Sequence, residues 1–90
     1  MIFSLGNTEL VWEFDPNNTN AAEIPDNNLK LVKNSATLWN MRDIVGYDDC
    51  CVSVHRLSEN EFYFVTFLGL GFTMRIEDHT VTCIKKTITK

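Results

Sequence analysis

Four short apolar segments separated by tight turns dominate the second half of this 90-residue chain. Short strands joined by turns of two or three residues are typical of an antiparallel meander. The third segment alternates strictly between apolar and polar residues, which is the pattern of a strand with one buried face. The second is apolar on both faces and predicts a central strand covered on both sides. The predicted strands are residues 50–57, 61–68, 72–77 and 80–88.

The first third of the chain indicates a hairpin followed by a long loop. Residues 2–5 and 9–14 flank Gly6-Asn7-Thr8, and alternating apolar residues in the second segment favour a strand. Residues 15–28 contain five Asn and both prolines. Asn and Asp bond their own backbone and Pro cannot donate to a sheet, so this stretch is predicted to be a loop. Residues 29–33 then suggest a short strand.

One helix is predicted, over residues 35–45. Apolar residues recur there at i, i+3 and i+7 from Leu38 to Val45, Ser35 is suited to the N-cap, and Gly46 to the C-terminal end. A strand in this stretch is the alternative. We therefore expect a mainly β (α+β) fold in a single domain spanning residues 1–90. It would contain an antiparallel sheet with a C-terminal meander and one short helix.

Charge and cysteine content narrow the classes of partner. The net charge is −4, and residues 1–29 hold five acids and no base. Phosphate binding needs clustered Lys and Arg, so we expect no nucleic-acid partner and favour a basic protein. No apolar stretch is long enough for a membrane span and the N-terminus lacks a signal-peptide pattern, so we expect no membrane association. Three cysteines, two of them adjacent, form no disulfide framework, which indicates reduced thiols and the cytoplasm.

The stretch YDDCCVSVH, residues 47–55, contains the most reactive side chains. In a regular strand, Cys51 and His55 would share one face at roughly 13 Å, too far apart for a nucleophile to bond its base. Catalysis by Cys51 would need another partner, such as His79. The simpler interpretation is that Cys50 is a small buried apolar residue. Adjacent cysteines do not chelate zinc well, and no metal site or cofactor is expected.

Acidic side chains that flank the predicted loops are the candidate binding residues. Carboxylates accept paired hydrogen bonds from Arg, so such residues suit a basic protein partner. Trp12 and Trp39 would add anchors if they were exposed, although burial is the commoner fate of Trp. The candidate partner-binding acids are Glu13, Asp15, Glu23, Asp26, Asp43, Asp48 and Asp49.

In size, acidity, aromatic meander and Asn- and acid-rich loop, the chain resembles the small bacterial immunity proteins. It is similar in character to those paired with contact-dependent growth-inhibition toxins and other polymorphic toxins. The resemblance implies a non-catalytic protein that binds and neutralises a cognate toxin, often a nuclease with a basic cleft. Two alternatives remain open at this point: a thiol-dependent enzyme or redox protein using Cys51 with a histidine, and an adaptor or subunit that pairs through an open sheet edge.

Overall fold

The protein is mainly β, as the sequence predicts. The computed structural model describes residues 1–15, 17, 23–77 and 80–88. Eight strands and one short helix are present in this described part. Their bounds are β1 (Ile2–Leu5), β2 (Thr8–Trp12), β3 (Leu29–Lys33), β4 (Ala36–Asn40), α1 (Arg42–Val45), β5 (Cys51–Arg56), β6 (Glu61–Thr66), β7 (Leu70–Glu77) and β8 (Thr80–Ile88).

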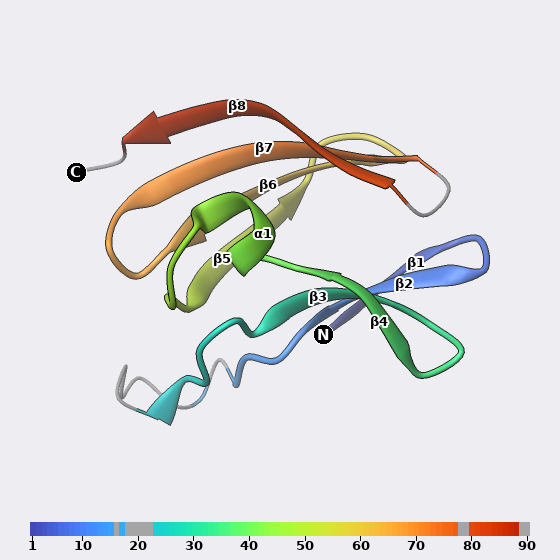
Figure 1. Ribbon diagram of the computed structural model, residues 1–90, viewed down its shortest axis with the longest axis horizontal. Helices are drawn as coiled ribbons and strands as arrows, with labels where there is room; N and C mark the ends of the chain where they lie inside the picture. Colours follow the sequence, from blue (N-terminus) through green and yellow to red (C-terminus); the bar gives the residue numbers. More distant parts are fainter. Residues whose placement is uncertain (16, 18–22, 78–79, 89–90) are drawn as a thin grey trace.

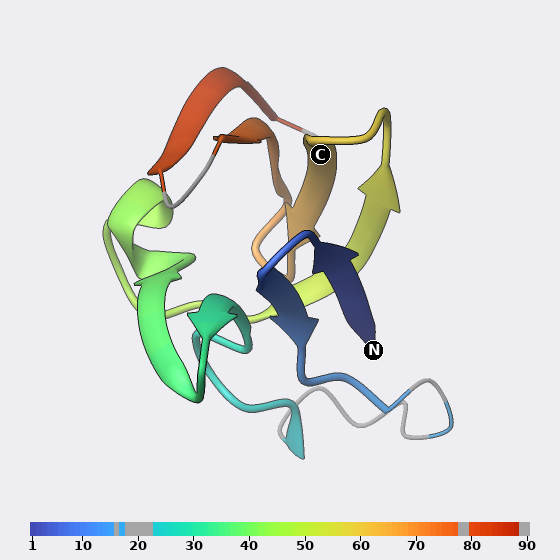
Figure 2. The same cartoon turned by 90° about the vertical axis from the view of Figure 1, so that its right-hand side faces the viewer.

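The strands form two antiparallel four-stranded sheets, each built from consecutive strands. The first sheet has the order β1-β2-β3-β4 and the second β5-β6-β7-β8, so each is a meander. Figure 1 shows the sheets as two layers, with α1 in the segment that connects them. In the view of Figure 2 the sheets curve around a shared interior. The chain thus completes one sheet before it begins the other.

The inward faces of both sheets supply one hydrophobic core. Leu10 and Leu31 from the first sheet and Phe62 and Met74 from the second are fully buried. The Phe3 ring of β1 meets the Phe62 ring of β6 edge to face, with centroids 5.3 Å apart. Full burial of each such side chain contributes roughly 1.5–3 kcal/mol. The predicted inward face of 72–77 is confirmed, and both tryptophans belong to this core instead of to the surface.

The predicted helix over residues 35–45 is wrong for most of its length. Residues 36–40 form strand β4, and the helix has only the four residues of α1. Asn34 and Ser35 both have positive φ, 49° and 66°, as both central residues of a type I′ hairpin turn must. Ser35 therefore turns β3 into β4 and caps no helix. The predicted end of the helix at Gly46 is confirmed, since Gly46 has φ 88° and its N–H donates to the Arg42 carbonyl at 2.8 Å.

The turn between β6 and β7 also differs from expectation. The prediction extended the strand through Leu68, but β6 ends at Thr66, and Phe67 and Leu68 are half-exposed in the turn. Gly69, with φ 89°, is a turn glycine as expected. Gly71, also expected in the turn, is instead a buried residue of β7. It packs against the Tyr63 side chain, and a Cβ at this position would lie 2.7 Å from the Thr87 hydroxyl.

Within the described residues, no helix has the length and apolar character that crossing a membrane requires.

Candidate functional site

Three segments from distant parts of the chain meet at one end of the molecule. They are the end of the long loop before β3, the connection from α1 to β5, and the β6–β7 turn, all on the left of Figure 1. Together they surround an open pocket of about 480 Å³, which we call the acidic pocket. Its lining residues are Ile24, Pro25, Asp26, Asp48, Asp49, Cys50, Phe67 and Leu68.

Hydrogen bonds fix these segments to one another. The Asn27 backbone N–H donates to the Asp49 carbonyl at 2.8 Å, and its side-chain amide donates to the Asp48 carboxylate at 3.0 Å. The Phe67 N–H donates to the Cys50 carbonyl at 2.9 Å. Asn27 has φ 54°, a conformation that Asn tolerates better than most residues. The three walls of the pocket are therefore held in place by backbone contacts.

Asp49 lines the acidic pocket with only 4% of its surface exposed, and we call the position of this buried acid the base of the pocket. Its Oδ1 accepts a hydrogen bond from the Cys50 N–H at 2.8 Å. Its Oδ2 is buried and finds no hydrogen-bond donor among the described residues. Asp26 and Asp48 are both exposed and form the rim. Asp48 shares its charge with the Arg42 guanidinium at 3.3 Å, whereas neither Asp26 nor Asp49 forms an ion pair with a described residue.

A second pocket, of about 350 Å³, adjoins the acidic pocket because Ile24 and Pro25 line both. We call it the neighbouring pocket, and its acids are Glu13, Asp15 and Glu23. The Lys30 ammonium lies 2.5 Å from the Glu13 carboxylate and offsets its charge. Six of the seven candidate acids thus gather around two adjoining pockets.

Asp43 is the exception, because it lines neither of these two pockets. It is exposed in the first turn of α1, where its Oδ2 accepts a hydrogen bond from the Asn40 N–H at 3.3 Å. This contact stabilises the start of the short helix. The structure therefore gives Asp43 a local role and does not bring it to the other acids.

Asn28 hydrogen-bonds together the segments next to the site, and it was not identified from the sequence. Its side-chain amide donates to the Glu13 and Cys51 carbonyls, both at 3.0 Å, and its Oδ1 accepts from the Cys51 N–H at 2.6 Å. The Trp12 indole donates to the same Cys51 carbonyl at 3.1 Å. One buried amide thereby joins the end of β2, the start of β3 and the start of β5.

The adjacent cysteines are both buried, and neither thiol is hydrogen-bonded to a histidine of the described residues. A register shift between Cys51 and Ser53 breaks the regular alternation expected for this strand, so Cys51 enters the core. Its thiol donates to the Ser53 carbonyl at 3.3 Å, and burial raises its pKa to about 12. His55 instead contacts the Ser53 hydroxyl at 3.0 Å. Burial, then the negative charges of Asp49 and Asp26, raise the pKa of the Cys50 thiol.

His79, the other histidine considered as a partner for Cys51, lies outside the described residues. In the part of the chain that is described, no group of three or more His, Cys, Asp or Glu side chains is placed to hold a metal ion.

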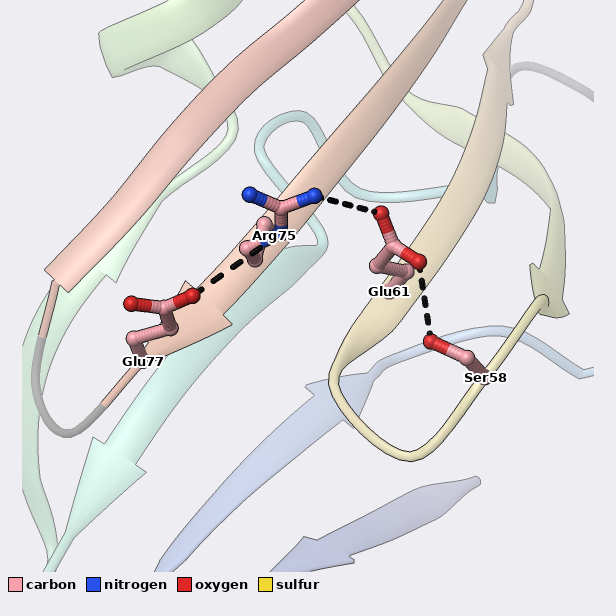
Figure 3. Close-up of polar contacts among 4 residues, drawn as sticks. All are labelled: Ser58, Glu61, Arg75 and Glu77. Atoms are coloured by element: carbon pink, nitrogen blue, oxygen red, sulfur yellow. Dashed lines mark hydrogen bonds and ion pairs between the residues drawn. The ribbon is translucent and has the colours of Figure 1, made fainter.

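A second polar cluster lies where β5 turns into β6 (Figure 3). Glu61 and Arg75 face each other across β6 and β7, with 3.1 Å between carboxylate and guanidinium. The Ser58 hydroxyl donates to the other Glu61 oxygen at 3.0 Å, and Glu77 lies 3.8 Å from Arg75. The Arg75 hydrogen bond, followed by that of Ser58, lowers the pKa of the Glu61 carboxyl. Because both Glu61 and Glu77 form an ion pair with Arg75, this cluster links β6 to β7 and leaves neither carboxylate unpaired for a ligand.

The β8 edge is another candidate surface. This strand has nine residues and pairs only with β7 in the described sheet. Ile84 and Ile88 are exposed on it, and so are Lys85 and Lys86. Lysines on an edge strand discourage pairing with another strand. The β8 edge therefore suits a partner less well than the acidic pocket does.

Compared with known proteins, the chain matches no family model, no curated protein and no solved structure.

Proposed function

We propose that this protein is a non-catalytic binding protein that neutralises a basic protein toxin, as the immunity proteins it resembles do. The observation that carries the proposal is the gathering of six candidate acids around two adjoining pockets at one end of the molecule. A nuclease cleft is basic because it binds phosphates, so an acidic surface gains association rate and specificity for it.

Exposed apolar side chains next to the acids strengthen the proposal. Phe67 and Leu68 are 51% and 53% exposed and line the acidic pocket. Large apolar residues at the centre of a polar rim are typical of the energetically important part of a protein interface. A surface made only for solubility would not need two such side chains beside three acids.

The thiol alternative is less well supported. Nucleophilic cysteines have lowered pKa values and access to solvent. Cys51 has the opposite properties, with a buried thiol and a pKa of about 12. All three cysteines are free, which agrees with a reducing compartment, and we place the protein in the cytoplasm as part of this proposal.

A pull-down of the tagged protein tests the proposal. Cells would co-express the chain with the neighbouring open reading frames, and the proteins retained at moderate salt would be identified by mass spectrometry. We expect one stoichiometric basic partner whose toxicity disappears in the complex. Retention of no partner, or of a partner whose toxicity persists, would contradict the proposal.

A matched pair of double variants locates the contact. Asp26→Asn/Asp48→Asn neutralises the rim of the acidic pocket, and Glu9→Gln/Glu59→Gln makes the same change of charge at exposed positions elsewhere. We expect the first variant to bind the partner about tenfold more weakly or worse, a loss of roughly 1.4 kcal/mol. The control should bind within about twofold of the unchanged protein, because only distant screened charges differ.

A further inference from the structure

Two buried hydrogen-bond acceptors, one on a residue that lines the acidic pocket and one on a residue hydrogen-bonded to it, have no donor among the described residues. The Oδ2 of Asp49 and the Oδ1 of Asn27 are both buried, and neither has a donor among the described residues. Asp49 lines the acidic pocket, and Asn27 is hydrogen-bonded to both aspartates of the α1–β5 connection. A buried polar atom without a partner costs about 1–3 kcal/mol, and more where it is charged. Such atoms are rare in native structures and call for a donor from water or from a ligand.

We infer that the acidic pocket receives one arginine side chain of the partner protein, with Asp49 at its base, Asp26 and Asp48 at its rim and the β6–β7 turn as its apolar wall. This inference rests on the proposed function, since it specifies the contact by which the partner is recognised. It adds the chemical identity of the central residue that the partner must present.

The donor pattern selects arginine. A guanidinium carries five N–H donors and no acceptor, which complements the carboxylate oxygens of the three aspartates that line the pocket. Its flat, weakly hydrated plane stacks on apolar surface, and its methylene stem packs there. Phe67, Leu68 and Pro25 provide that surface in the same pocket. A lysine ammonium supplies charge but is compact and strongly hydrated, so it packs less well against this apolar surface.

Uncompensated charge at the base of the acidic pocket supplies the attraction. Asp49 is buried without a counter-ion among the described residues, and charges act more strongly through low-dielectric surroundings than through water. At the neighbouring position, burial and then the charges of Asp49 and Asp26 raise the pKa of the Cys50 thiol. Oδ2 itself is covered in the unbound protein, so the guanidinium pairs with the exposed Asp26 and Asp48 carboxylates, and the buried charge of Asp49 adds to the attraction.

Titration of the full chain with blocked amino acids tests the inference without an identified partner. The probes are N-acetyl-arginine amide, N-acetyl-lysine amide and N-acetyl-citrulline amide, which is neutral but similar in shape to arginine. Backbone amide NMR shifts measure binding. We expect arginine to give saturable shifts confined to residues 24–28, 47–50 and 66–69, with a dissociation constant on the order of 1–10 mM. Lysine should bind at least about threefold more weakly, and citrulline should give no saturable shift.

Variants separate this site from general charge attraction. Asp49→Asn keeps the oxygen that accepts from the Cys50 N–H and removes the buried charge, so arginine should bind about tenfold more weakly or worse. Glu9→Gln is the control and should have no effect. Phe67→Ala alters a half-exposed wall and should weaken arginine about threefold, which keeps the test decisive if Asp49→Asn fails to fold.

Equal binding of arginine and lysine, shifts spread over the whole surface, or unchanged arginine binding in both pocket variants would overturn the inference. The two proposals fail in different ways. If a toxin is captured but arginine shows no saturable binding, the proposed inhibitor function is supported and the arginine site is refuted. If arginine binds as described but no toxin is retained, the site stands and the proposed function falls.

Discussion

Replacing Asn28 with Ala should destabilise the protein more than almost any other polar substitution. The side chain is 1% exposed and makes three hydrogen bonds to backbone groups of two other segments. At about 1 kcal/mol for each bond, Asn28→Ala should lower the free energy of unfolding by roughly 3 kcal/mol. Small domains have only about 5–15 kcal/mol in total. The melting temperature should fall by about 12–24 °C.

Urea unfolding measures the loss. Tryptophan fluorescence is a suitable signal because the Trp12 indole and the Asn28 amide donate to the same Cys51 carbonyl. Asn28→Asp is the sharper variant, since it keeps the acceptor for the Cys51 N–H but turns the donor into an oxygen that faces two carbonyls. It should be at least as destabilising as Ala. Asn7→Ala, at an exposed turn position, is the control and should change stability by less than about 0.5 kcal/mol.

The refuting result is a loss below about 1 kcal/mol for Asn28→Ala with an unchanged urea dependence. It would mean that the segments joined by Asn28 are held by core packing alone. The acidic pocket would then not depend on this amide for its position.

Three further predictions concern other parts of the molecule. In the folded protein a thiol reagent at pH 8 should modify the exposed Cys83 quickly and the buried Cys51 only on unfolding, and equal rates would contradict the raised pKa. Arg75→Gln should raise the Glu61 pKa towards its ordinary value in an NMR titration, because the arginine contact is the main cause of its lowering. A carboxyl pKa that is lower in the folded than in the unfolded protein stabilises the fold at pH values above the unfolded-state pKa. The difference in unfolding free energy between the unchanged protein and Arg75→Gln should therefore shrink as the pH falls through the folded-state pKa of Glu61. A difference that stays constant with pH would argue against a stabilising Glu61–Arg75 contact. Gly71→Ala should cost about 1–3 kcal/mol in thermal unfolding, because its Cβ would enter occupied space, and an unchanged melting temperature would show that the covering ring moves aside.

Strand positions follow well from the sequence where alternation and turn residues agree. The predicted segments 2–5, 29–33 and 80–88 are strands with the same bounds. The error at 35–45 has a local cause, because the turn that begins β4 is Asn34-Ser35 and lacks the glycine that signals a type I′ hairpin. Without that signal, apolar residues at helical spacing were the stronger pattern.

The candidate acids could be chosen from the sequence, but their grouping could not. Asp26 and Asp48 are far apart along the chain, and the hydrogen bonds of Asn27 bring their segments together. Asn28 is one of five Asn in its loop, and no local pattern distinguishes it from the others. The exposure of Phe67 depends on where β6 ends, which the aromatic composition of that strand conceals.

The consecutive order of strands within each sheet has a consequence for synthesis of the chain. Every strand pairs with its neighbour in sequence, so the loops closed on folding are short, except for the one between β2 and β3. Local pairing of this kind favours fast folding. The first sheet can complete its hydrogen bonds before the second has left the ribosome, but its inward face, with Leu10, Leu31 and Trp39, has nothing to pack against until then. The half-made protein is therefore most exposed to aggregation when the first meander is finished and the second has not begun.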